Sequence, residues 1–161
     1  DDADVFKYTQ DNAKLYGGEI GFHLHPHPID WLHLESTFET VTGKQDNNDY
    51  LPLIPANKWN NTIRTEFDIK EWLSDGYATF TVANTFKQNN VSSFETTSDA
   101  YTVVNLVFGG NIKLNNFNFE LTLNANNLFD TSYISHLSRL KNDGINAIGR
   151  NIVAGVNFKL N

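Results

Sequence analysis

Four histidines fall within one short stretch of the chain: His23, His25, His27 and His33. In extended strands, His23 and His25 share a face with Glu19, and His33 shares a face of the next strand with Glu35. Imidazole and carboxylate groups together can bind zinc or iron. We favour a different interpretation, in which these polar side chains line a wall beside a turn that contains Pro26 and Pro28. We therefore predict no metal site.

A charged row and an acidic loop are the next candidates, formed respectively by Arg64, Glu66, Asp68 and Lys70 and by Asp46, Asp49 and Tyr50. The charged row could belong to a transport path, but we interpret it as a polar wall of paired charges. The acidic loop could contact an extracellular ligand or calcium. Its spacing does not match a 12-residue calcium loop, so a solvated loop is favoured.

No group of residues predicts catalysis. Ser135, His136 and Asp143 lie in one polar segment, but nothing in the sequence orients a nucleophile against a base. No two carboxylates have a spacing in the sequence that supports acid–base chemistry. We predict no catalytic residues, no cofactor and no enzymatic activity, and the substrate-binding residues remain unassigned.

The elements that must position these side chains are β-strands. In Phe117–Asn126 one face carries Phe117, Phe119 and Leu121 while the other carries polar residues, and this alternation recurs throughout the chain. It predicts seven strands, at Val5–His25, Ile29–Val41, Asn60–Lys70, Tyr77–Gln88, Tyr101–Leu114, Phe117–Asn126 and Ile148–Leu160. Most reach the roughly 10 residues that a tilted strand needs to cross a bilayer.

The predicted connections alternate between short turns and long polar loops. The short turns are 25–28, 71–76 and 115–116, and the long loops are 42–59, 89–100 and 127–147. Outer-membrane barrels sort their connections in this way, with short turns on the periplasmic side and long loops outside. Trp31, Trp59, Trp72 and Tyr77 lie near predicted strand ends, where we favour an interfacial girdle over sugar stacking.

Composition excludes several other classes of protein. The formal net charge of −7 argues against a nucleic-acid partner. The 161 residues contain no cysteine, so disulfides and thiolate metal sites are absent from them. No run of 18 apolar residues predicts a transmembrane helix.

Several segments, taken in order, resemble TonB-dependent outer-membrane receptors. Tyr16–Ile20 followed by Pro28–Leu34 is similar to a G-x-E strand and the next strand of that family, and Leu53–Lys58 resembles its P-x-x-P loop. Asn124–Tyr133 is similar to the motif N-x-x-N-L-F-D-x-x-Y of the penultimate strand. Gly149–Phe158 resembles the terminal strand, G-R-x-x…G-x-x-F.

This resemblance implies that residues 1–161 are the C-terminal segment of a barrel of about 22 strands in the bacterial outer membrane. Its implied partners are outer-membrane lipid, an N-terminal plug domain, TonB and an extracellular ligand. The implied function is TonB-coupled uptake of a scarce ligand, which would be an iron chelate, haem, cobalamin or glycan.

Two alternatives remain open at this point. A hairpin at Asp11–Ala13 would divide the first strand, and the resulting eight strands could form a complete small barrel with a structural or adhesion role. The other alternative is a soluble β-sandwich that binds carbohydrate through its aromatic residues.

Overall fold

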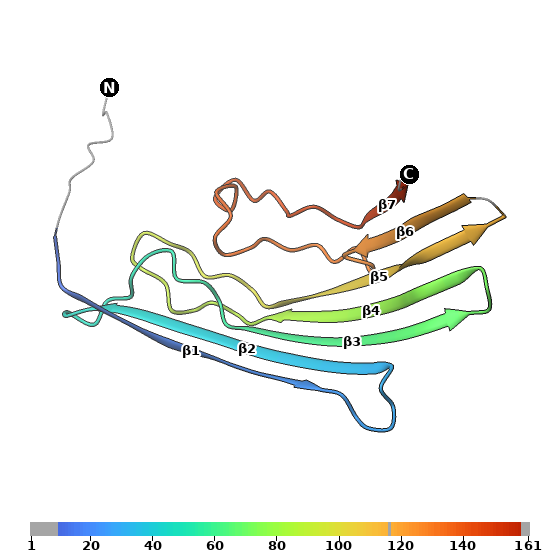
Figure 1. Ribbon diagram of the computed structural model, residues 1–161. Coiled ribbons are helices and arrows are strands. Elements are labelled where there is room, and N and C mark those ends of the chain that lie inside the picture. Colours follow the sequence, from blue (N-terminus) through green and yellow to red (C-terminus); the bar gives the residue numbers. More distant parts are fainter. Residues whose placement is uncertain (1–9, 116, 159–161) are drawn as a thin grey trace.

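The computed structural model describes residues 10–115 and 117–158, and every regular element in them is a β-strand (Figure 1). The strands are β1 (Ala13–Leu24), β2 (Leu32–Gln45), β3 (Lys58–Ile69), β4 (Leu73–Thr85), β5 (Tyr101–Leu114), β6 (Phe117–Asn126) and β7 (Asn151–Phe158). The all-β prediction of about seven long antiparallel strands is confirmed. Among the described residues, no helix is long and apolar enough to cross a membrane.

The seven strands form one sheet in the order β1-β2-β3-β4-β5-β6-β7, and each strand pairs with its neighbour in antiparallel orientation. A sandwich requires two packed sheets, so the soluble β-sandwich does not fit the described residues. The proposed extra strand at Val5–Gln10 lies, apart from Gln10, outside the described residues, and the eight-strand alternative therefore stays a prediction.

Predicted and observed strand limits agree best for β5 and β6, which begin and end at the predicted residues. The other strands start elsewhere than predicted: among the described residues β1 begins at Ala13, β3 begins at Lys58 rather than Asn60, and β7 begins at Asn151 rather than Ile148. Two further differences have a visible cause. β2 begins at Leu32 rather than Ile29, because the Ile29 amide donates to the Pro26 carbonyl (2.6 Å) in a turn. β4 begins at Leu73 rather than Tyr77, because Leu73 already pairs with Ile69 and Ile112 ahead of an irregular register.

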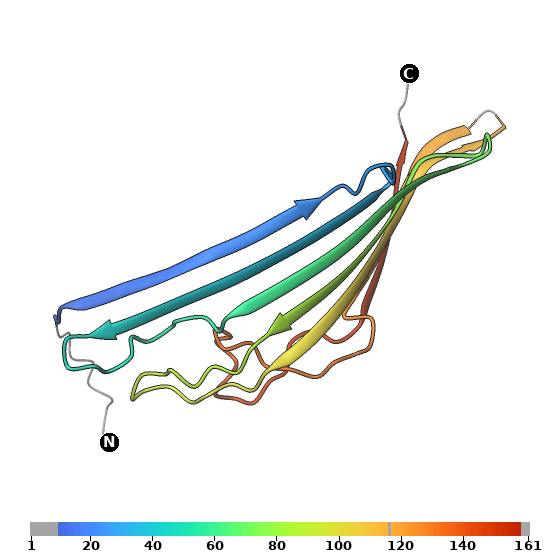
Figure 2. The same cartoon turned by 90° about the horizontal axis from the view of Figure 1, so that it is seen from below.

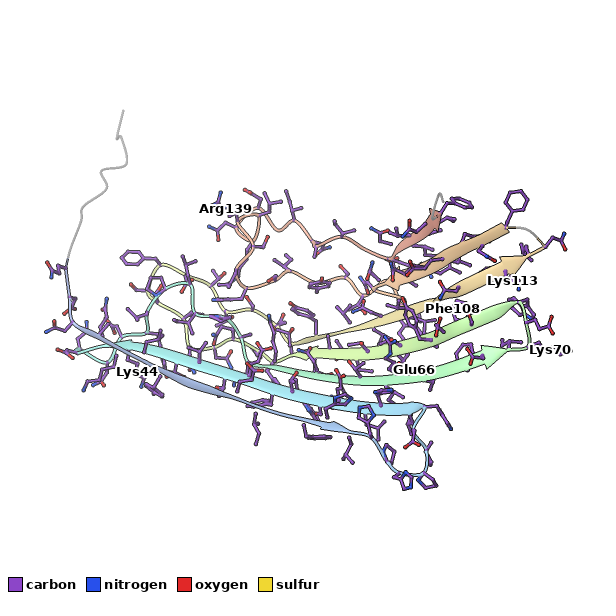
Figure 3. All side chains as sticks on the ribbon, viewed as in Figure 1. Lys44, Glu66, Lys70, Phe108, Lys113 and Arg139 are labelled. Carbon is purple, nitrogen blue, oxygen red and sulfur yellow. The ribbon has the colours of Figure 1, made fainter. Side chains whose placement is uncertain are left out.

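The short and long connections sit at opposite ends of the sheet. Residues 25–31 and 70–72 and the connection from β5 to β6 join strands at one end, while residues 46–57, 86–100 and 127–150 join them at the other. Figure 2 shows the long loops gathered at one end of a twisted, curved sheet. In Figure 3, Lys44 marks the long-loop end, and Lys70 and Lys113 mark the short-turn end.

The registers divide the side chains of the sheet into two faces of different character. The apolar face carries rows such as Leu34, Ile63, Phe80, Leu106 and Ala125. The polar face carries Glu35, Thr62, Thr81 and Asn105 in the corresponding positions. Within the described strands, the charged residues that share the apolar face are Lys14 and Lys44, which pair at the long-loop end.

Apolar side chains of the last three strands share one face of the sheet. Phe119 and Leu121 face Phe158 and Val156 across β6 and β7, and Leu123 pairs with Phe108 on the other side. Leu106 and Val104 follow on the same face of β5. These side chains therefore form one face, with polar neighbours such as Thr122 and Asn124 pointing the opposite way.

Leu73 anchors the short-turn end of the sheet and is fully buried. Its side chain fits against two glycines: a Cβ on Gly110 would lie 2.7 Å from Leu73 Cδ1, and a Cβ on Gly76 would lie 3.1 Å from Leu73 Cδ2. Any larger residue at Gly110 would displace Leu73. The glycines thus allow an irregular stretch of β4 to stay packed on β5.

Candidate functional site: a histidine cluster on the polar face

The first hairpin brings three histidines together near a short turn. β1 and β2 pair so that His23 lies opposite Glu35, and His33 lies opposite Arg64 of β3. His25 directly follows the end of β1. Because side chains alternate along a strand, His23, His25 and His33 all point to the polar face.

The three imidazoles, which we call the histidine cluster, are in direct contact. Ring centroids are 4.4 Å apart for His23 and His25, 4.0 Å for His25 and His33, and 5.6 Å for His23 and His33. One ring nitrogen from each residue lies within 4.8 Å of the other two. The fourth histidine, His27, is outside the cluster and lies beside Asp30 (3.3 Å) on the exposed turn.

Carboxylates from β2 and β3 flank the cluster. Glu35 Oε1 lies 3.6 Å from His23 Nε2, and Glu66 Oε1 lies 3.6 Å from His33 Nε2. Arg64 Nε approaches the same Glu66 oxygen at 3.0 Å, which holds that carboxylate in place. Figure 3 labels Glu66 on β3, between the two ends of the sheet.

One buried atom of the cluster lacks a hydrogen bond. His33 Nε2 is buried and has no hydrogen-bond partner among the described residues, because 3.6 Å to Glu66 is too long for one. Buried polar atoms are nearly always paired, so such an atom requires an explanation.

The predicted charged row is partly confirmed. Arg64 and Glu66 form an ion pair on the polar face, and Asp68 Oδ1 accepts a hydrogen bond from the Asp75 amide (2.8 Å). Lys70 lies in the turn after β3 rather than in the row. The Arg64 guanidinium also lies over the Tyr77 ring, 4.4 Å from its centroid. Tyr77 therefore faces the polar side, and its predicted place in an interfacial girdle was wrong.

The long loops carry a second group of contacts, which we call the loop cluster: Glu95, Ser98, His136 and Lys141. His136 is buried, its Nδ1 lies 2.9 Å from Ser98 Oγ, and its Nε2 lies 3.7 Å from Glu95 Oε1. Lys141 Nζ lies 3.1 Å from His136 Nδ1 and donates to the Thr96 carbonyl. These contacts join the loop of residues 86–100 to the loop of residues 127–150.

Burial, hydrogen bonds and neighbouring charges shift the pKa values of two groups of the loop cluster, His136 and Glu95. Burial lowers the pKa of His136, the Lys141 ammonium lowers it further, and the Glu95 carboxylate opposes both. Partial burial acts to raise the pKa of Glu95. Hydrogen bonds from the amides of Leu53 and Ser92 and from the Ser92 hydroxyl, together with the charge of His136, outweigh burial and leave that pKa below its ordinary value.

A cleft of about 370 Å³ opens beside the loop cluster. Its wall includes Tyr101 and Tyr133, which stack with ring centroids 4.1 Å apart, and Asp99, Lys141 and Asn146. Since Tyr101 belongs to the polar face of β5, this cleft lies on the same side of the sheet as the histidine cluster, at the opposite end.

The other residues singled out from the sequence have local roles. His136 contacts Ser98, a residue of another loop, rather than forming a site with Ser135 and Asp143. Asp49 accepts a hydrogen bond from Asn47 Nδ2 (2.9 Å) within its own loop. Ser98 was not among the candidates, because its partner is 38 residues away and no periodicity connects them.

The N-x-x-N-L-F-D segment stabilises the loop between β6 and β7 through hydrogen bonds. Asn127 is buried and exchanges hydrogen bonds with the backbone of Thr131 (2.8 and 2.9 Å). Asp130 Oδ1 accepts from the Arg150 amide (2.8 Å), and a Cβ on Gly149 would lie 2.5 Å from that oxygen. The segments Asn124–Tyr133 and Gly149–Phe158 are thus in contact, and the missing side chain at Gly149 makes room for Asp130.

The fold is shared with a known transporter. No protein-family model matches the sequence, and no curated protein matches it. Among the solved structures that match is "Copper transporter OprC", with a TM-score of 0.76 and 22% sequence identity. The similarity covers 93% of this chain, and this chain spans 23% of the length of that one. At this level of identity the comparison shows a common fold: the run of antiparallel strands described above matches about a quarter of that longer chain.

Proposed function

We propose that this chain forms part of the wall of an outer-membrane transporter that takes up a scarce ligand and has no catalytic activity. The observation that carries the proposal is the pair of contrasting faces on one sheet of long strands. A sheet with one apolar face and one polar face suits a barrel wall between lipid and a water-filled lumen. The sorted loops and the fold shared with a copper transporter support the same function.

In this proposal the apolar face contacts outer-membrane lipid and the polar face lines the lumen. The long loops lie on the cell exterior, where the cleft beside Tyr101 and Tyr133 is available to an extracellular ligand. The short turns, and with them the histidine cluster, lie on the periplasmic side. Uptake is driven through a plug domain and TonB, and the ligand is an iron chelate, haem, cobalamin, a glycan or a metal ion.

The orientation is tested with single cysteines, for which these 161 residues provide a clean background because they contain none. Ser93→Cys places a thiol on an exposed long loop, and Lys70→Cys places one on an exposed short turn. In intact Gram-negative cells, a membrane-impermeant maleimide should label position 93 alone. Position 70 should become labelled after the outer membrane is permeabilised. Labelling of both positions in intact cells, or recovery of the protein in a soluble fraction, would contradict the proposal.

Transport is tested separately by growth. A strain that lacks the protein should grow more slowly than its parent when one of the proposed ligands is the limiting nutrient, and depletion of TonB should produce the same defect. Equal growth on every proposed ligand would refute uptake while leaving the membrane orientation intact.

A further inference from the structure

We infer that His23, His25 and His33 form a binding site for a divalent first-row transition metal ion, with copper(II) bound most tightly. The inference concerns binding alone and does not depend on the proposed transport function. It departs from the sequence-based interpretation, which treated these residues as a polar wall.

The geometry requires little adjustment to hold a metal ion. Histidine nitrogens bind zinc at about 2.0–2.1 Å, so two such ligands on a tetrahedral ion lie roughly 3.3 Å apart. The candidate nitrogens already lie within 4.8 Å of one another, and side-chain rotation alone can close the remaining gap. His23 and His25 are exposed near the end of β1, where such rotation is least hindered.

The hydrogen-bonding state of His33 favours the same conclusion. Its buried Nε2 has no hydrogen-bond partner in the described part of the chain, an arrangement that is unfavourable for a histidine with a purely structural role. A metal ion bound through the other ring nitrogen of His33 would leave Nε2 as an N–H donor directed at Glu66, whose Oε1 lies 3.6 Å away.

The flanking carboxylates complete the site. Metal-bound histidines commonly direct their second ring nitrogen to a carboxylate, which fixes the ring and increases its basicity. Glu35 and Glu66, each 3.6 Å from an imidazole, are placed for this role, and their negative charge favours a divalent cation. Arg64 keeps Glu66 oriented through its 3.0 Å contact.

The ligand set indicates which metals bind. Imidazole suits copper(II), nickel and zinc, whereas magnesium and calcium prefer oxygen ligands. The 161 residues contain neither cysteine nor methionine, so the sulfur ligands preferred by copper(I) are absent from this stretch. Among divalent ions the expected order places copper above nickel and zinc.

The test measures copper(II) and zinc(II) binding to the purified protein in detergent by competition with a chromophoric chelator. The wild-type protein should bind one ion at this site, with nitrogen couplings in the electron paramagnetic resonance spectrum of bound copper(II). His33→Gln and His25→Gln should each weaken binding by roughly tenfold or more, and Glu66→Gln should weaken it by about 10–100-fold. Magnesium should not compete.

His27→Ala is the matched control, because it removes a histidine of the same turn that lies outside the cluster. It should leave the affinity unchanged. If the half-buried His33 variant fails to fold, the exposed His25 variant still provides the test. The inference is overturned if the wild type binds neither ion, or if the variant with all three histidines replaced by glutamine binds as much copper as the wild type.

Discussion

Adjacent residues on one strand experience opposite environments in the proposed barrel. Leu121, near the middle of β6, belongs to the apolar face and pairs with Gly110 and Val156. Thr122 belongs to the polar face and pairs with Gly109 and Gly155. Substitutions at these two positions therefore compare the two faces of the sheet at nearly the same depth along the strand.

We expect Leu121→Arg to cost about 2–4 kcal/mol of folding free energy in a bilayer, because the charge would face hydrocarbon near the midplane. Thr122→Arg should cost well under half of that, since its charge would face water. Equilibrium unfolding in urea, with the protein in lipid vesicles, measures both values. Equal costs at the two positions would remove the reason for assigning the apolar face to lipid.

At the same scale, the sequence predicted which residues share a face but not which of them touch. The alternation placed His23 and His25 together and put His33 on the next strand. Whether the strands bring them into contact depends on the hairpin register, which the turn at 26–31 determines through the hydrogen bond from the Leu32 amide to the Ile29 carbonyl (3.0 Å). That turn was predicted to be shorter, so the contact could not be foreseen.

Among the elements, the long loops have the clearest response to pH. The pKa of His136 lies below its ordinary value of 6.5, so the closed loop cluster binds fewer protons than the open one as the pH falls through this range. Opening is therefore favoured below about pH 6.5. The lowered pKa of Glu95 acts in the same direction at still lower pH, below its ordinary value of 4.5.

We expect hydrogen exchange at residues 127–150, corrected for the intrinsic effect of pH, to become several-fold faster between pH 7.5 and pH 5.5. His136→Gln should abolish most of this change, because glutamine can still hydrogen-bond to Ser98 but does not titrate. His27→Ala serves as the control and should leave the pH dependence of hydrogen exchange unchanged. An unchanged pH dependence in His136→Gln would show that other groups control the loops.

The strands themselves were largely predictable because period-two alternation is a local property. The limits of β5 and β6 agree with prediction, and the two strands pair in one continuous register. β4 was placed too late because Leu73 precedes an irregular register around Gly76, which no alternation marks. The predicted end of its strand at Gln88 was also late: that side chain turns away to donate to the Ile54 and Pro55 carbonyls (2.9 and 3.0 Å).

On the scale of the whole molecule, the described sheet leaves large apolar side chains uncovered. Ile20 is 72% exposed and Ile152 is 71% exposed, on the apolar faces of β1 and β7. Within the described residues, each of these two strands has a neighbour on one side only. Exposed edges and large apolar patches both promote association in water.

We therefore expect the 161-residue chain, produced by itself, to associate in aqueous buffer and to become monodisperse in detergent. Size-exclusion chromatography with light scattering measures the mass in both conditions. A monodisperse monomer without detergent would contradict the proposed lipid contact and would favour a sheet that closes on itself.

The opposite placement of the histidine cluster and the loop cluster has an energetic consequence. A strand of 12 residues such as β1 extends on the order of 40 Å at about 3.3 Å per residue, and the two clusters lie near opposite ends of such strands. Perturbations more than about 10 Å apart without shared partners usually contribute additively to stability. We therefore expect metal binding at one end not to change the free energy of loop opening at the other. For a variant that combines His25→Gln with His136→Gln, the change in the free energy of unfolding should equal the sum of the two single changes.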